Sequence, residues 1–361
     1  MSVVNISPNQ VLPGMIIADD VISGDGIKLV TRNTIVNEKI VVKLKMGNIK
    51  HLSVFIPQSL ADRISADDPI FAKANKLKSS PQFKIFKKEY LASTDALKGV
   101  FSDIVMKHKA SYEVKDLLSS IDNVLKECEN SMTTFEMLHC MRDYDDLTYV
   151  HSLNVSLICH SFAKWLNLSE DDINAVTAAG LLHDIGKTMI PIDIIGKPGK
   201  LTAEEYGEIK KHPILGYQLI MDAPLDARIK EAVLSHHERM NGTGYPRGLK
   251  DGQIGDFAKI VSITDVYDAM TATRVYRGPI CPFDVVERME SDGYSMYDAK
   301  YLLTFLQHIA QSYINSPVLL TNSLRGEVIM INKSHLSRPV VKVEDQFFDL
   351  SSMDVKVKCL L

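Results

Sequence analysis

Cysteine is scarce in this sequence and follows no recognisable pattern. The 361 residues contain five cysteines at irregular spacings, with no CxxC pair, and the N-terminal stretch MSVVNISPNQ carries no secretory signal. These features argue against a secreted, disulfide-linked protein. We therefore expect the protein to work in a reducing cytoplasm.

Long apolar runs and a strong charge imbalance are also missing. The longest apolar runs fall far short of the roughly 20 residues that a membrane-spanning helix needs, so we expect no span. The chain has 41 basic and 45 acidic residues, which gives no overall field that would favour DNA or an anionic membrane. An anionic ligand must then be held by local charges.

The hydrophobic content, 45% of the residues, is sufficient for one large and one small core. Residues 1–57 alternate short strands with one helix and predict a small α+β domain. A regulatory role is one function that such a domain could have. Residues 58–105 are polar and lysine-rich, which indicates a linker or connecting helices with a solvated face. Residues 106–315 have helical periodicity, and residues 316–361 return to alternating, β-branched segments typical of a short strand-rich extension.

Two adjacent histidines end one of the predicted helices. His236 and His237 continue the apolar stripe of Ile229, Ala232 and Val233. Both side chains are therefore predicted to point into the helical domain.

A second polar group lies in the segment AVTAAGLLHDIGK. His183 shares a helix face with Val176 and Ala179, and Asp184 follows it directly, with Lys187 one turn later. A histidine, a carboxylate and a cation are thus expected close together.

Three further side chains occupy positions where core or helix-junction residues are expected: His151, Asp265 and His212. His151 follows the apolar spacing of Leu147 and Val155, and Asp265 lies on an apolar stripe of its own helix. His212 directly precedes a proline, which places it where one helix ends and another begins.

Each of these residues alone is more often an ordinary core side chain than a ligand. Together, five inward histidines and two inward aspartates carry a large desolvation cost unless a partner satisfies them, and a divalent metal is an efficient partner. The set exceeds what one ion needs. Two ions about 3.5 to 4 Å apart, with one bridging carboxylate, would use all seven.

The strings HDIGK and HHERMNGTGYP resemble the HD-GYP phosphodiesterases, a branch of the HD-domain metal-dependent phosphohydrolases. The resemblance covers residues from about 125 to 315, and residues 1–57 resemble the small domain often found ahead of this unit. It implies a mainly α fold, an HD-type bundle of about seven or more helices. It also implies hydrolysis of cyclic di-GMP with iron or manganese as the usual metals.

The resemblance further assigns individual residues. It places His151, His183, Asp184 and Asp265 on one metal, and His212, His236 and His237 on the other, with Asp184 bridging. Asp184 and Lys187 would be catalytic, and the phosphate contacts would come from Lys187, Arg274 and Arg277.

Two positions depart from the family pattern. Relatives with a third metal carry a glutamate where this chain has Leu147, with Asp145 and Asp146 only nearby in the sequence, so we expect two ions. Asn241 replaces the usual aspartate of the loop; an amide cannot act as a base, but it can still order the loop. The loop would be shaped by Asn241, Gly242, Gly244 and Pro246, while Tyr245 either stacks on a purine of the substrate or packs within the loop.

The main prediction is a two-metal phosphodiesterase that opens cyclic di-GMP to linear pGpG, and further to GMP if the product is cut again. A mixed cyclic GMP-AMP substrate fits the same ligands. A non-catalytic, metal-loaded sensor that binds a signalling protein through the GYP loop or the N-terminal domain is a different class of function. So is a phosphohydrolase acting on mononucleotides. A homodimer through the connecting helices is also consistent with the sequence.

Overall fold

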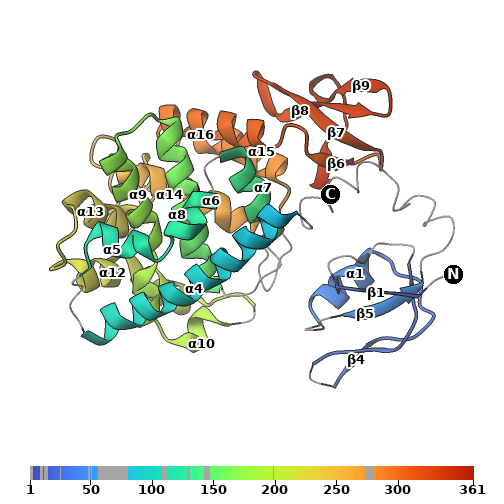
Figure 1. Ribbon diagram of the computed structural model, residues 1–361, viewed down its shortest axis with the longest axis horizontal. Coiled ribbons are helices and arrows are strands. Elements are labelled where there is room, and N and C mark those ends of the chain that lie inside the picture. Colours follow the sequence, from blue (N-terminus) through green and yellow to red (C-terminus); the bar gives the residue numbers. More distant parts are fainter. Residues whose placement is uncertain are drawn as a thin grey trace. The chain divides into compact units, whose positions relative to one another are not determined.

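Figure 1 shows the computed structural model, in which the chain divides into two compact units, Met1–Ala72 and Lys73–Leu361. The structure describes residues 3–8, 11, 15–24, 26–47, 49, 51–55, 80–107, 112–127, 131–141, 147–197, 199–272 and 280–361. Among the helices in these ranges, none combines the length and the apolar character that crossing a bilayer requires.

The N-terminal unit is the small α+β module that the sequence predicts. Its three-stranded antiparallel sheet has the order β1 (Val3–Ile6), β5 (Leu52–Phe55), β2 (Ile16–Ile17). A separate hairpin pairs β3 (Val21–Ile22) with β4 (Lys28–Val30).

One helix completes this unit. Helix α1 (Glu38–Lys45) starts after Asn37, whose side-chain oxygen accepts a hydrogen bond from the backbone N–H of Ile40 and so caps the first turn. Leu44 of α1 is fully buried with Ile17 and Val54 of the sheet. This cluster is the core of the N-terminal unit.

The second unit, here called the main unit, is a helical bundle, as predicted. Helices α8, α9 and α14 pack against one another, and α13 packs on α9 and α14 (Figure 1). The helices are α4 (Pro81–Lys107), α5 (Val114–Ser119), α6 (Asp122–Glu127), α7 (Ser131–Met141), α8 (Leu147–Trp165), α9 (Glu170–Leu182), α10 (Ile192–Ile195), α11 (Ala203–Ile209), α12 (His212–Ile220), α13 (Ala227–Ser235), α14 (Asp256–Thr271), α15 (Pro282–Gly293) and α16 (Ala299–Ser312), with a 3-10 helix η2 (Ile185–Met189) after α9.

Helix α4 differs from the expectation of a solvated connecting helix. Its side chains Phe86, Tyr90, Leu97 and Phe101 are fully buried in the core of the main unit. The lysines of this stretch dominate its composition, but the aromatic and aliphatic residues between them recur at helical spacing and form a buried stripe. α4 is therefore a core helix of the bundle.

The C-terminal extension is strand-rich, as predicted, and it also belongs to the main core. Its antiparallel sheet has the order β10 (Val357–Leu360), β6 (Pro317–Leu320), β7 (Arg325–Asn332), β8 (His335–Val343), β9 (Gln346–Asp349), with a 3-10 turn η3 at Leu350–Ser352. Val318 and Val341 are fully buried in the same hydrophobic cluster as the helices. The sheet is thus packed on the bundle.

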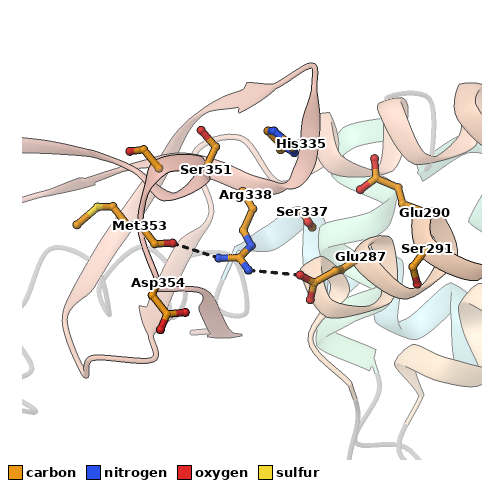
Figure 2. Close-up of a pocket in the computed structure, with 10 residues that line it drawn as sticks. Glu287, Glu290, Ser291, His335, Ser337, Arg338, Ser351, Met353 and Asp354 are labelled. Atoms are coloured by element: carbon orange, nitrogen blue, oxygen red, sulfur yellow. Dashed lines mark hydrogen bonds and ion pairs between the residues drawn. The ribbon is translucent and has the colours of Figure 1, made fainter.

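A cavity of about 600 Å³ lies where the sheet meets α15 (Figure 2). Glu287 and Glu290 of α15 face His335 and Arg338 of β8 across it, and Arg338 donates to Glu287 over 3.4 Å. None of its lining residues belongs to the predicted metal ligands. The predicted chemistry must lie elsewhere in the bundle.

Candidate metal centre

The seven predicted ligands come together inside the main unit as two groups. One group contains His151, His183 and Asp265, and the other contains Asp184, His212, His236 and His237; within each group the ligand atoms lie within 4.8 Å of one another. The residues come from α8, the end of α9, the junction of α11 and α12, the end of α13, and α14. Side chains far apart in the sequence thus meet at one point of the bundle.

Asp184 faces both groups. Its Oδ2 atom lies 3.3 Å from Nε2 of His183 and 3.6 Å from Nε2 of His151. Its Oδ1 atom lies 3.2 Å from Nε2 of His212 and 4.0 Å from Nε2 of His236. One carboxylate therefore reaches ligand atoms of both groups, as a bridging ligand must.

Two of these buried atoms make no hydrogen bond within the described part of the chain. They are Nε2 of His183 and Oδ1 of Asp184, whose side chains are 0% and 1% exposed. An unsatisfied buried polar group costs about 1–3 kcal/mol, and divalent cations held by the two groups would satisfy both atoms. The residues present therefore fit a divalent metal, and imidazole with carboxylate suits iron, manganese or zinc.

The helix ends fix three of the histidine rings. Nδ1 of His183 donates to the carbonyl of Gly180, Nδ1 of His212 to that of Ile209, and Nδ1 of His236 to that of Val233, over 2.7 to 2.9 Å. These carbonyls lie in the last turn of α9, α11 and α13, where no backbone N–H follows to pair with them. Each hydrogen bond leaves Nε2 directed at the centre.

His151 is oriented differently, because it lies inside a helix. Its Nδ1 lies 2.7 Å from Oδ2 of Asp268, and its Nε2 lies 3.0 Å from Oδ1 of Asp265. Asp268 was not among the residues that the sequence analysis selected. The signal was present: Asp268 comes three residues after Asp265 in α14 and so shares its face.

The surroundings set the protonation of the ligands. Burial lowers the pKa of His212 to about 4 and that of His237 to about 3, and it holds the pKa of His236 well below its ordinary value. Burial would raise the pKa of Asp184 and Asp265, but attraction to the neighbouring histidines, and for Asp184 also to Lys187, outweighs burial and holds both pKa values well below the ordinary range. Neutral imidazoles and ionised carboxylates are the forms that bind metals.

His151 again differs from the other histidines. Burial alone would lower its pKa, but the hydrogen bonds with Asp265 and Asp268 raise it to about 9. A metal at Nε2 of His151 must therefore compete with a proton.

Protein stripped of metal by a chelator is expected to lose stability as the pH falls below 6.5, the ordinary histidine pKa. The unfolded chain takes up protons there, whereas His212 and His237 stay neutral in the fold until about pH 4 and about pH 3, so the free energy of unfolding falls. We expect the free energy of unfolding to fall by on the order of 1 kcal/mol per histidine at about pH 5.5.

Urea unfolding at about pH 7 and at about pH 5.5 measures this fall in the free energy of unfolding. The variant His212→Asn should show a shallower pH dependence, and an equally steep one would contradict the assignment.

Lys187 lies beside the centre, and the other predicted phosphate contacts cannot be placed. Nζ of Lys187 donates to Oδ2 of Asp184 over 2.5 Å, and the lysine side chain is 25% exposed. The lysine therefore reaches the site from its edge. Arg274 and Arg277 lie outside the described residues, as do Asp145 and Asp146, and of Leu147 only the backbone, at the start of α8, is described.

The loop after α13 forms one wall of the centre. The ring of Tyr245 stacks on that of His237, with centroids 4.6 Å apart and 27° between the planes, which agrees with the packing alternative. The Tyr245–Pro246 peptide is cis. Burial raises the pKa of Tyr245 far above its ordinary value, so its hydroxyl stays protonated.

Asn241 orders the loop, as expected of an amide at this position. Its Oδ1 accepts hydrogen bonds from the backbone N–H and the hydroxyl of Thr243. Gly242 adopts a φ of 79°, which favours glycine. At Gly244 a Cβ would lie 2.4 Å from the backbone N of Arg239, so this glycine permits a close approach of two backbone segments.

Glu238 and Arg239 are loop-building residues that the sequence analysis did not select. The carboxylate of Glu238, 2% exposed, accepts the backbone N–H groups of Arg247 and Leu249 over 2.7 and 2.8 Å. Arg239 donates to Ser262 of α14 over 2.6 Å. The sequence does contain a signal for them, because two charged residues follow directly after two histidines that point inward.

Known proteins share both the sequence and the fold of this region. Residues 123–301 match the HD domain family. The cyclic di-GMP phosphodiesterase PA4108 of Pseudomonas aeruginosa is 33% identical over 230 residues, which are 63% of this chain and 54% of that protein. The 3'3'-cGAMP-specific phosphodiesterase 1 of Vibrio cholerae is 37% identical over 145 residues, 40% of this chain and 34% of that protein.

A solved structure extends the likeness in fold. Bd1817, described as a HDG"Y"P protein from Bdellovibrio bacteriovorus, superposes with a TM-score of 0.50 at 16% identity, covering 84% of this chain and 98% of that one. The chain spans about half, or less, of the length of the curated relatives. Residues 123–301, which carry the HDIGK and HHERMNGTGYP motifs, are thus an HD domain.

Proposed function

We propose that this chain is a two-metal phosphodiesterase that hydrolyses cyclic di-GMP to linear pGpG. The observation that carries the proposal is the carboxylate of Asp184 between two groups of buried ligands, with an unsatisfied atom on Asp184 and another on His183. Relatives named as cyclic di-GMP phosphodiesterases, from Pseudomonas aeruginosa and Thermotoga maritima, support the choice of substrate.

The ligands divide between two ions by their grouping in the structure. His151, His183 and Asp265 would hold one ion, His212, His236 and His237 would hold the other, and Asp184 would contact both. Such a pair supplies a water nucleophile that is active near neutral pH and offsets charge on the phosphoryl oxygens. We propose iron or manganese as the metal, because the HD-GYP proteins that the sequence resembles usually use them and the donor set suits both.

The chain's own residues have three tasks in this proposal. The hydrogen bonds from Nδ1 keep the ligand rings in place before substrate arrives, so little reorganisation accompanies the reaction. Lys187 places a cation at the edge of the site, where it can offset charge on the phosphodiester while it stays close to Asp184. Tyr245, packed on His237, walls the site on the side of the loop.

Purified protein loaded anaerobically with manganese or iron is expected to cut cyclic di-GMP to pGpG. Chromatography of the reaction mixture measures the substrate that is lost and the product that forms. Chelation should abolish the reaction, and adding the metal back should restore it. Metal analysis of anaerobically isolated protein identifies the native ion. A metal-replete protein that leaves cyclic di-GMP intact would refute the proposal.

The same assay separates the other candidate functions. The relative from Vibrio cholerae named for 3'3'-cGAMP makes a mixed cyclic dinucleotide the second candidate, so both substrates are assayed side by side at equal concentration. Release of phosphate or pyrophosphate from mononucleotides would indicate a phosphohydrolase of another kind. Two bound ions without turnover of any of these would indicate a sensor.

A further inference from the structure

We propose that Asp268, Asn154 and Tyr90 form a buried hydrogen-bonded chain that positions His151 for metal binding and makes helix α4 part of the support of the metal centre. This inference rests on the proposed metal site. None of the three residues belongs to the set that the sequence motifs indicate. They come from α14, α8 and α4 respectively.

The chain is continuous from the ligand to α4. Nδ1 of His151 and Oδ2 of Asp268 are 2.7 Å apart, and Nδ2 of Asn154 donates to Oδ1 of Asp268 over 3.1 Å. The hydroxyl of Tyr90 in turn donates to Oδ1 of Asn154 over 2.5 Å. Tyr90 is 0% exposed, Asp268 4% and Asn154 6%, so water has little access to any of these bonds.

The chemistry of the groups fixes the direction of every bond. A carboxylate only accepts hydrogen bonds, so both partners of Asp268 must donate to it. The amide of Asn154 must therefore turn its NH₂ group toward Asp268, which leaves its oxygen for the hydroxyl of Tyr90. The proton of His151 is held on Nδ1, and Nε2, which faces Asp265 and Asp184, is the atom available as a ligand.

His151 needs such a chain because of its place in the fold. His183, His212 and His236 lie at helix junctions, where unpaired carbonyls orient them. His151 lies within α8, where the nearby carbonyls are used by the helix itself. Among these four histidines, His151 is oriented by other side chains, and the hydrogen bonds of those side chains extend to Tyr90 of α4.

The bonds can be removed one at a time. Tyr90→Phe removes the hydroxyl at the end of the hydrogen-bonded chain. Asn154→Leu removes both hydrogen bonds of the side-chain amide at nearly constant volume, and Asp268→Ala removes the carboxylate that accepts from His151. Tyr313→Phe is the matched control, because Tyr313 is also buried and its hydroxyl lies 2.8 Å from that of Tyr267. Both tyrosine variants lose one buried hydroxyl.

The experiment measures the binding of manganese to the 361-residue chain. Electron paramagnetic resonance distinguishes free from bound Mn²⁺ and gives the affinity and the number of ions bound. Asp268→Ala is expected to weaken one of the two binding events about 10- to 100-fold. Tyr90→Phe should weaken the same event about three- to tenfold, with Asn154→Leu between the two. Tyr313→Phe should bind Mn²⁺ like the wild type, even if its stability falls as much as that of Tyr90→Phe.

The outcomes separate this inference from the proposed function. Equal Mn²⁺ affinity in wild type, Tyr90→Phe and Asn154→Leu would overturn the inference, as would equal weakening in Tyr90→Phe and Tyr313→Phe. A wild type that binds neither Mn²⁺ nor, when loaded anaerobically, iron would overturn both proposals. The expected affinity series in a protein that cuts no cyclic dinucleotide would refute only the proposed function.

Discussion

Replacing Asp184 with alanine is expected to reduce the hydrolysis of cyclic di-GMP by at least about a thousandfold, the largest effect of any single ligand. Asp184 reaches atoms of both ligand groups, so its loss weakens both metal positions, whereas the loss of another ligand weakens one. Its removal also leaves Lys187 without the carboxylate that it contacts. Metal content should fall in the same variant.

The comparison for this variant is Asp172→Asn. Asp172 is also a carboxylate of low pKa, held there by hydrogen bonds with Arg228 and Ser169, but it lies at the exposed start of α9. That variant should keep the metal content and the turnover of the wild type. Turnover of Asp184→Ala within tenfold of wild type would show that the site is wrongly assigned.

Gly186→Ala is expected to have the second largest effect, through the backbone. A Cβ on Gly186 would lie 2.0 Å from the carbonyl oxygen of His212 and 2.5 Å from the backbone N of Gly216. Because these are backbone atoms, η2 and α12 must move apart, and α12 carries His212. We expect a loss of roughly 2–4 kcal/mol in the free energy of unfolding and weaker binding at the group that contains His212.

Gly207→Ala provides the control for that experiment. Gly207 lies in α11 and has no atom within 4 Å of the position of an added Cβ. Alanine should be neutral or stabilising there by up to about 1 kcal/mol. Chemical unfolding and metal content of both variants test the pair, and a Gly186→Ala protein as stable and metal-rich as Gly207→Ala would contradict the proposed close approach.

The sequence predicts the ligand positions because burying an ionisable side chain is rare without a partner. His236 and His237 on an apolar stripe, and Asp265 on another, could be selected from periodicity alone. That these side chains meet at one point could not be predicted in the same way. The spacing of residues within a helix shows which side chains share a face, but not which other helix packs against that face. The family resemblance supplied the grouping.

The supporting residues were beyond reach of the same reasoning. Asn154 and Tyr90 lie on helices whose packing is set by long-range contacts, and an asparagine or tyrosine in a helix has many ordinary roles. The composition of helix α4 indicates a solvated helix because its lysines outnumber the aromatic residues that bury its inner face. Glu238 acts through backbone groups of a loop whose path the sequence does not give.

The carbonyls at helix ends that hold His183, His212 and His236 affect which sequence changes this domain can accept in evolution. Main-chain carbonyls do not depend on the identity of the side chain of their residue, so substitutions at Ile209 or Val233 keep the acceptor itself. An inserted or deleted residue in the last turn would instead turn the histidine by about 100° relative to the rest of its helix. The centre can therefore tolerate drift in sequence near its ligands far better than drift in helix length.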